Sequence, residues 1–333
     1  MDISVDNSTQ SVISYETPWT RNIKFSFFVA LQPPALILNS ILIVYLLFNR
    51  TLRQTLQYHA VLVLLIVTFL TNSIEVPRII HYLHLGIVLP QTSLNCLIWQ
   101  CCDYLLFSTV NVLMCWTSIE RYLLIFHRNL FATARGRLLY HYMPFVVIIV
   151  YLTLFYIAAI FIYPCDAQFD FSQPLCGFPC YATQSVISFY DLFAHSFCPM
   201  LVDMSLDIVL IFRVLYRKRV GLLQQQQQHQ AREWRKNCKM IVQLLFITCT
   251  YMVFQVPFDV MVMLLVFINL PEWAIEMQAM YFYYFFWVLT LVLPFACLIC
   301  LPEVIKKIKN SMLRRERRTN MVMPMTLTRY NRN

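Results

Sequence analysis

The chain has 333 residues and a formal net charge of +9, and 59% of its residues are hydrophobic while only 13% are charged. A soluble domain carries about a quarter charged residues, so this composition excludes an ordinary soluble protein and is typical of a polytopic membrane protein. Seven spans of roughly 20–25 residues use about half of such a chain and leave little for a separate soluble domain. We therefore expect one all-α membrane domain, a seven-helix bundle at residues 22–301.

Lysine and arginine are concentrated in alternate connections between the predicted spans and in the C-terminal tail. These basic segments are 49–57, 121–141, 213–239 and the residues after 302. The intervening connections, near 84–95, 163–184 and 269–278, contain no lysine or arginine. By the positive-inside rule the basic segments face the cytosol and the N-terminus lies outside. The basic excess therefore indicates topology and contact with the inner leaflet, not nucleic acid.

The N-terminal tail, residues 1–21, is polar through residue 19 and lacks the apolar core of a signal peptide. Asn7 begins an N-glycosylation acceptor, Asn-Ser-Thr, on the predicted outer side. The first span is predicted at 22–48, where we expect Asn39 to hydrogen-bond to a neighbouring helix. The second span is predicted at 56–83, and its run VLLIVTFLTNS contains no acid.

The third span, 96–122, has an acid inside it and a charged triplet at its end. Asp103 and Arg121 lie five helical turns apart, about 27 Å, which is nearly the thickness of the hydrocarbon layer. Residues at helical spacing predict one continuous face, made up of Asp103, Phe107, Asn111, Met114, Ser118 and Arg121. The span begins with Cys96 and closes with Glu120, Arg121 and Tyr122.

The remaining spans are predicted at 138–163, 185–216, 238–268 and 273–301. The fifth span holds unusually many ionisable groups for a membrane helix, namely Asp191, His195, Asp203 and Asp207. Residues 302–318 predict a basic amphipathic helix on the inner leaflet, followed by a cytoplasmic tail to residue 333.

The third span resembles the third helix of rhodopsin-like (class A) G-protein-coupled receptors. Glu120-Arg121-Tyr122 stands where that family has its E/D-R-Y triplet, and Cys96 stands at the family's extracellular disulfide cysteine. The resemblance covers about residues 26–309 and includes one proline in each of the last three spans, Pro199, Pro257 and Pro294. It implies a plasma-membrane receptor that binds an extracellular ligand in the outer half of the bundle and activates heterotrimeric G proteins.

The sequence departs from the family at three motifs. The second span lacks the aspartate that holds a sodium ion, so we expect no sodium site of the usual kind. Gln255 replaces the tryptophan of the CWxP motif, and Leu293 and Cys297 replace the asparagine and tyrosine of NPxxY. These changes concern the activation mechanism more than the fold.

Four cysteines fall on the predicted outer side, where oxidation is allowed: Cys96, Cys165, Cys176 and Cys180. The resemblance implies that Cys96 pairs with Cys176 or Cys180. The sequence leaves both alternatives open, because four cysteines allow three pairings. Cys165 would pair with the remaining partner.

The resemblance also implies a ligand site around Asp103, which stands where amine receptors hold the ligand's ammonium group. Together with acids at matching depth it predicts a pocket of negative potential, suited to an amine or the basic end of a peptide. The predicted ligand-binding residues are Asp103, Phe107, Asp191, His195, Phe258, Asp259 and Tyr283. Other aromatic residues of the last two spans, including Trp287, are expected to pack the bundle. In the alternative interpretation Asp103 pairs internally, with His195 or Arg78.

The predicted coupling residues lie at the inner end: Glu120, Arg121, Tyr122, Asp207, Pro257 and Pro294. Asp207 occupies the place of a fifth-helix tyrosine that meets the arginine in active family members. We hypothesise that an Arg121–Asp207 ion pair favours an active-like arrangement and raises basal signalling. Alternatively, Asp207 meets Arg213 or water.

The sequence leaves two other classes as alternatives to the receptor. A seven-helix ligand-gated chemoreceptor channel would place the N-terminus inside, and a transporter should show related halves with broken helices. The sequence shows no nucleophile–base set and no metal-ligand cluster, so we expect no enzyme activity, cofactor or metal.

Overall fold

The computed structural model describes residues 17–50, 56–223, 228–268 and 271–300. Within these ranges the chain consists of helices and their connections, with no strand. Seven helical segments are long and apolar enough to cross a membrane. The structure therefore confirms the expected all-α fold with seven membrane-length helices.

The first three spans are α1 (Pro18–Phe48), α3 (Leu56–Leu85) and α4 (Ser93–Phe126). The fourth consists of α5 (Ala134–Arg137), a π-helical turn (Leu138–Tyr142), α6 (Met143–Ile157) and a second π-helical turn (Ala158–Ile162). The fifth consists of α7 (Ser185–Leu192), a π-helical turn (Phe193–Phe197) and α8 (Cys198–Leu223). The sixth is α9 (Gln228–Phe267), and the seventh consists of α10 (Glu272–Met280), a 3₁₀ turn (Phe282–Tyr284) and α11 (Phe285–Cys300).

Two spans begin earlier than their apolar runs predict, because polar caps start them. The hydroxyl of Thr17 accepts a hydrogen bond from the backbone N–H of Thr20, and Pro18 takes the first helical position. Thr92 caps α4 in the same way through the N–H of Asn95. The predicted starts at residues 22 and 96 are therefore too late by one turn each.

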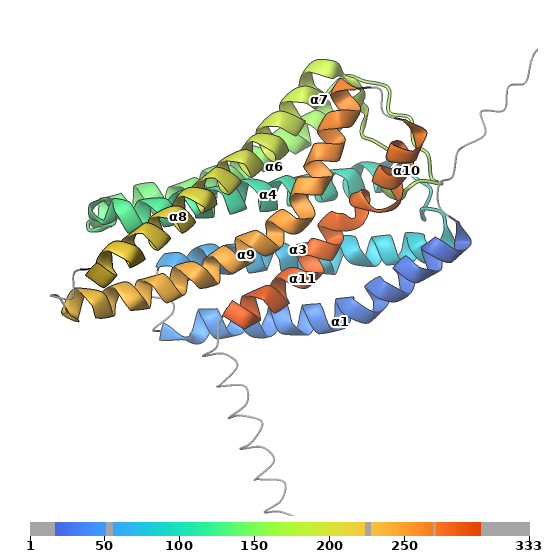
Figure 1. The fold of residues 1–333 in the computed structure, drawn as a ribbon. Helices are drawn as coiled ribbons and strands as arrows, with labels where there is room; N and C mark the ends of the chain where they lie inside the picture. The colour runs from blue at the N-terminus through green and yellow to red at the C-terminus, as the bar shows by residue number, and fades with distance from the viewer. Residues whose placement is uncertain (1–16, 51–55, 224–227, 269–270, 301–333) are drawn as a thin grey trace, which may run out of the picture.

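The α4 helix is central to the packing. It contacts α3, α6 and α8, while α3 also packs against α1 and α11 (Figure 1). Polar side chains tie these helices together inside the core. Asn39 of α1 hydrogen-bonds to Thr68 of α3 at 3.1 Å, as predicted, and Asn72 of α3 donates to the carbonyl oxygen of Thr290 in α11 at 3.0 Å.

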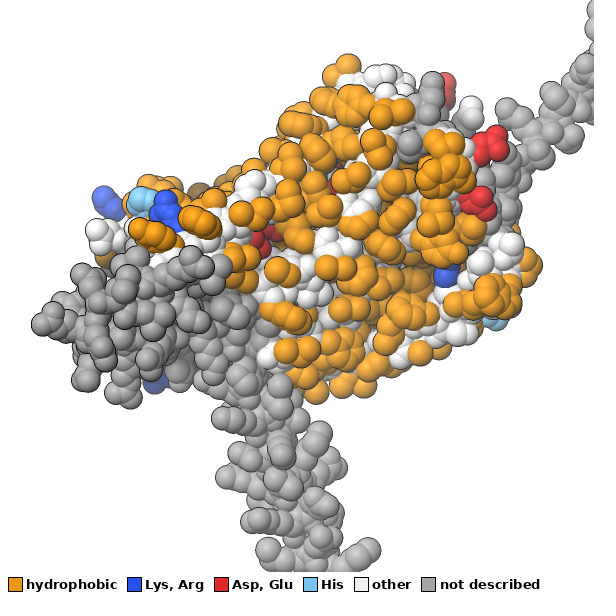
Figure 2. Space-filling model, viewed as in Figure 1, with side chains coloured by type: hydrophobic (Ala, Val, Ile, Leu, Met, Phe, Trp, Pro, Cys, Tyr) orange, Lys and Arg blue, Asp and Glu red, His pale blue; other side chains and the backbone are white. Residues whose placement is uncertain are grey.

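The outer surface of the bundle is apolar along its middle. Figure 2 shows hydrophobic side chains over this region on one face, with charged side chains gathered mainly at the two ends. The α6 helix exposes a row of large aliphatic residues, Val146, Val147, Val150 and Leu154. Such a surface matches hydrocarbon and not water.

The two ends of the bundle differ in chemistry. The disulfide end, at the right of Figure 1, contains the bond between Cys96 and Cys176, and the basic end contains the triplet at 120–122. The second disulfide joins Cys165 to Cys180. These bonds decide between the two pairings that the sequence left open.

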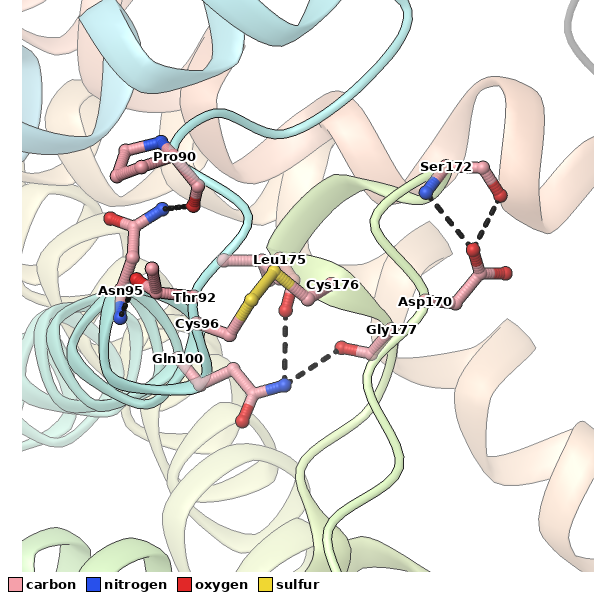
Figure 3. Close-up of a disulfide and its surroundings, with 10 residues drawn as sticks. All are labelled: Pro90, Thr92, Asn95, Cys96, Gln100, Asp170, Ser172, Leu175, Cys176 and Gly177. Atoms are coloured by element: carbon pink, nitrogen blue, oxygen red, sulfur yellow. Dashed lines mark hydrogen bonds between the residues drawn. A yellow bond between two sulfur atoms is a disulfide. The ribbon is translucent and has the colours of Figure 1, made fainter.

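A polar anchor supports the Cys96–Cys176 bond (Figure 3). Gln100, one turn along α4, donates to the carbonyl oxygens of Leu175 and Gly177, at 3.0 and 3.2 Å. Leu175 and Cys176 both have positive φ angles, 58° and 57°, which residues other than glycine rarely adopt. The disulfide and Gln100 thus hold this connection against α4 in an unusual backbone conformation.

Two predicted features lie outside the described residues. These are the glycosylation acceptor at Asn7 and the amphipathic helix after residue 302.

Candidate functional site

Asp103 lies in the half of α4 nearest the disulfide end and is almost completely buried. The indole Nε1 of Trp287 in α11 donates to its Oδ1 at 3.2 Å. Within the described residues no basic side chain forms an ion pair with Asp103, so it pairs with neither His195 nor Arg78. The buried carboxylate is therefore without a counter-ion in this part of the chain.

Aromatic rings surround this carboxylate. Phe107, one turn further along α4, packs edge-on against Phe258 at 5.5 Å and against Phe286 at 5.0 Å between ring centroids. Tyr283 packs against Trp287 at 5.2 Å. The structure thus brings Asp103, Phe107, Phe258 and Tyr283 into one group, joined by Phe286 and Trp287. Trp287, expected from the sequence only to pack the bundle, also forms the hydrogen bond to Asp103.

Sequence reasoning missed a second buried acid, Glu75 of α3. Its side chain is fully buried, and neither carboxylate oxygen accepts a hydrogen bond from the described residues. Glu75 stands two residues beyond the run VLLIVTFLTNS, which contains no acid. The position of Glu75 inside the predicted second span could have identified it, because an acid inside a membrane-length helix is costly and usually functional.

Asp191 and His195 lie at the interface between the fourth and fifth spans. Asp191 accepts hydrogen bonds from the hydroxyls of Tyr156 and Tyr181, at 2.5 and 2.8 Å, and pairs with His195 Nδ1 at 2.8 Å. The hydroxyl of Tyr151 lies 2.8 Å from the other ring nitrogen of His195. In the described part of the chain, no hydrogen bond or ion pair joins these two predicted ligand residues to Asp103.

Tyr181 belongs to the connection before the fifth span. Burial, with the nearby charge of Asp191, raises the pKa of its phenol well above the ordinary value. The phenol therefore stays protonated and donates to Asp191. This bond fixes the connection to α7.

Asp259 is fully buried in α9 and belongs to a polar network in the middle of the bundle. Its Oδ1 accepts from Ser196 at 2.5 Å and from Gln255 at 2.9 Å, while its Oδ2 has no hydrogen-bond partner among the described residues. Asn111 of α4 donates to Ser196 at 3.3 Å and accepts from Tyr251 at 2.7 Å. Tyr251 thus connects α9 directly to α4, while Gln255, which also donates to Ser196 at 3.4 Å, connects α9 to the fifth span.

Arg121 is buried near the basic end of α4. Its Nε donates to the carbonyl oxygen of Thr117 at 3.0 Å, and Nη2 donates to the hydroxyl of Ser118 at 2.7 Å. Nη1 lies 3.9 Å from Oδ1 of Asp207 in α8. The structure thus places Asp207 opposite Arg121, as the hypothesis requires, with the two charges at the long limit of an ion pair.

Two further hydrogen bonds connect α8 to its neighbours at this level. Ser118 of α4 donates to Asp203, and Thr248 of α9 donates to Asp207. The acids of the fifth span therefore tie it to both the third and the sixth spans.

Glu120 contacts a histidine, not its neighbour Arg121. Its Oε1 pairs with Nδ1 of His141 at the start of the fourth span, and Nε2 of His141 lies 3.0 Å from Nδ1 of His59 in α3. Glu120, His141 and His59 thus form a chain of contacts across three spans. These contacts of Glu120 and His141 were not predicted from the sequence.

Arg213 of α8 packs against two aromatic rings at the C-terminal end of α4. Its guanidinium lies 4.5 Å from the ring centroid of Phe126 and 5.9 Å from that of Tyr122. Arg213 therefore stacks on aromatic rings, and Asp207 faces Arg121 instead of Arg213.

A small cavity lies between α3, α4 and α9, beside Arg121. Its volume is about 20 Å³, and its lining includes Glu120, Arg121 and Thr248. This volume admits about one water molecule, so the three helices are closely packed at the basic end.

Pro257 and Pro294, the remaining predicted coupling residues, lie inside α9 and α11. Each removes one backbone hydrogen bond from its helix and is a natural site of bending. No group of three or more metal-ligating side chains that could hold an ion is present in the described residues.

Comparison with protein-family models and with curated proteins gives no match. The fold of the described residues, all-helical with seven membrane-length helices, defines the class as a multi-pass membrane protein. Beyond that class, the arrangement of the buried polar residues is the guide to function.

Proposed function

We propose that this protein is a divergent rhodopsin-like G-protein-coupled receptor of the plasma membrane. In this proposal the N-terminus and the disulfide end face outward, and the basic end faces the cytoplasm. The support is the combination of seven membrane-length helices, the alternation of basic connections, the disulfide between Cys96 and Cys176, and the Glu-Arg-Tyr triplet at the other end of the same helix.

The proposed ligand carries a positive charge that binds Asp103. The observation that carries this proposal is a buried carboxylate whose only hydrogen bond comes from the indole of Trp287, with no basic partner among the described residues. A buried charge is costly without a counter-ion, and a ligand ammonium or guanidinium group would supply one. The surrounding rings of Phe107, Tyr283 and Trp287 suit a cation as well, because aromatic faces attract positive charge.

The proposed coupling step occurs at the basic end, around Arg121. The 20 Å³ cavity beside it is too small for a partner segment, so α9 must move away from α3 and α4 before a G protein can bind. Thr248, on α9, is hydrogen-bonded to Asp207 on α8, and Asp207 faces Arg121. Ligand binding would shift the population of the bundle toward the open arrangement through this connection.

A cell assay tests the ligand proposal. Cells that express the full chain are exposed to a panel of amines and basic peptides while calcium and cyclic AMP are measured. A ligand found in this way should lose potency by at least about 30-fold in Asp103→Asn, because a buried ion pair contributes about 2 kcal/mol or more. The control is Asp166→Asn, which removes an exposed acid from the connection before the fifth span. Equal potency at the Asp103 variant and the wild type would rule out the counter-ion role.

A further inference from the structure

A chain of hydrogen bonds leads from an acid of the fifth span to the outer surface of the bundle. Asp191 pairs with Nδ1 of His195 at 2.8 Å, and Nε2 of the same ring lies 2.8 Å from the hydroxyl of Tyr151 on α6. The hydroxyl of Tyr151 in turn lies 2.7 Å from that of Tyr190 on α7. His195 is only 2% exposed, whereas Tyr151 and Tyr190 are 41% and 48% exposed. The chain therefore begins inside the protein and ends at the surface between the fourth and fifth spans.

The donors of this chain all point inward. Because the carboxylate of Asp191 is an acceptor, Nδ1 of the neutral imidazole carries the hydrogen, and Nε2 accepts a hydrogen bond from Tyr151. A phenol has one hydrogen, so the bond between the two hydroxyls is donated by Tyr190. The oxygen of Tyr190 then accepts no hydrogen bond from the described residues, and an O–H group arriving at the surface could donate to it. A protonated imidazole would reverse the donors, and a hydroxyl group, which both donates and accepts, would fit that arrangement too.

Apolar side chains surround the two hydroxyls on the bundle surface. Val147 and Leu154, one helical turn to either side of Tyr151, are both exposed. Phe193, one turn beyond Tyr190 on the fifth span, is exposed as well. This part of the surface therefore faces lipid, where no water is present to bond with an exposed hydroxyl.

The position of Tyr190 along its helix gives the depth of the site. It lies five residues after Ser185, the first residue of the fifth span, which is about 8 Å along the helix axis. Each polar layer of a bilayer is about 5–8 Å thick, given about 30 Å of hydrocarbon in about 40–45 Å overall. The Tyr190 hydroxyl thus lies near the boundary between headgroups and hydrocarbon.

We propose that this surface binds a membrane sterol. The sterol hydroxyl forms a hydrogen bond with Tyr190, and its ring system lies against Val147 and Phe193, toward the basic end. A sterol carries one hydroxyl at the end of a rigid apolar body, so it presents the required group at this depth. Valine and phenylalanine side chains have few rotamers and form a firm surface for such a body. A diacyl lipid with a free hydroxyl would have to order two flexible chains, at a cost in entropy.

Photolabelling of the full chain in phosphatidylcholine nanodiscs tests the proposal. The probe is 6-azicholestanol, a photoactivatable sterol with a free hydroxyl, and mass spectrometry locates the labelled residues. Labelling should be saturable, should fall on α6 and on the fifth span near Phe193, and should be competed by cholesterol. Cholesteryl methyl ether, which cannot donate a hydrogen bond, should compete about three- to tenfold more weakly, the change expected for one net hydrogen bond.

Tyr190→Phe separates the hydrogen bond from the apolar contact, because it removes the hydroxyl and keeps the ring. In this variant cholesterol should lose its advantage over the methyl ether. A change that only disturbed the structure would weaken both competitors alike and leave the advantage in place. The matched control is Tyr142→Phe, which removes a hydroxyl from an exposed tyrosine at the basic end of the fourth span and should change neither competitor.

Three results would overturn the proposal: no saturable labelling of α6 or the fifth span, equal competition by the two compounds in the wild type, or an undiminished advantage of cholesterol in Tyr190→Phe. Competition by dioleoylglycerol at a lower concentration than cholesterol would assign the surface to a diacyl lipid and also contradict it. The experiment contains neither a soluble ligand nor a G protein, so its failure would leave the proposed receptor function unaffected.

Discussion

Asp103 and Asp191 are both acids inside membrane-length helices, but their surroundings differ. Both oxygens of Asp191 accept hydrogen bonds from tyrosines, and His195 pairs with it as well. Among the described residues, Asp103 receives only the indole N–H of Trp287. A fully bonded acid stabilises packing, whereas an acid without a counter-ion is available to a ligand. The sequence alone treats the two acids alike, because both lie at similar depth in the bundle.

Replacing Asp191 by asparagine should therefore destabilise the protein without abolishing its response to ligand. Asparagine keeps one neutral acceptor oxygen, so one of the two tyrosine hydroxyls loses its acceptor, at a cost of about 1–3 kcal/mol. Thermal unfolding of the purified variant should show a lower Tm. Asp166→Asn, the exposed control, should have the wild-type Tm. An unchanged Tm in Asp191→Asn would show that the tyrosine–aspartate contacts do not contribute to stability.

Replacing Asp207 by asparagine should lower basal signalling. The change removes the charge opposite Arg121 while keeping an acceptor for Thr248. Ligand-independent accumulation of second messenger, normalised to surface expression, measures the effect. Arg213→Gln is the comparison, because Arg213 stacks on Phe126 and does not face Asp207. Normal basal output in Asp207→Asn would contradict the role of the ion pair.

At the scale of helices, apolar runs predict the seven spans but not their ends or interruptions. The caps at Thr17 and Thr92 lie outside the apolar runs and set the helix starts. The seventh span was predicted as one helix, yet Tyr281 leaves helical geometry, with φ −122° and ψ −60°, and separates α10 from α11. Such features depend on local backbone geometry and packing, which periodicity does not encode.

The candidate site was also predicted only in part from the sequence. Asp103, Phe107, Phe258 and Tyr283 were grouped from helical spacing and family resemblance, and the structure brings them together. Glu75 was missed, although its position in an apolar span was visible in the sequence. The hydrogen bond from Gln255 to Ser196 and the contact of His141 with Glu120 could not be predicted, because each joins two different spans.

The two disulfides should differ in their contribution to stability. The bond between Cys96 and Cys176 closes a sequence separation of 80 residues and ties a connection to α4, whereas Cys165–Cys180 closes only 15. Restricting the longer loop removes more entropy from the unfolded chain, by about 1.5 kcal/mol in the chain-entropy description. Cys176→Ser should therefore lower Tm and surface expression more than Cys165→Ser. The reverse order would show that the local bond dominates.

At the scale of the whole molecule, one helix, α4, connects the two ends of the bundle. The α4 helix carries the disulfide at one end, Asp103 below it, and Arg121 at the other end. Polar contacts connect α4 to α8 and α9 along its length, through Ser196 and Asp259 in the middle and through Ser118 and Asp203 near the basic end. A receptor needs such a connection between an outer ligand site and an inner coupling site, and the account holds only if these two ends lie on opposite sides of the plasma membrane.

Antibody labelling of two epitope tags in intact cells tests this orientation most directly. One tag precedes residue 1, and the other is inserted between residues 224 and 227 in the connection after α8. The account predicts that the first tag is labelled on intact cells and that the second is labelled only after the cells are permeabilised. Labelling of the second tag on intact cells, with the first one protected, would invert the bundle and contradict the receptor assignment.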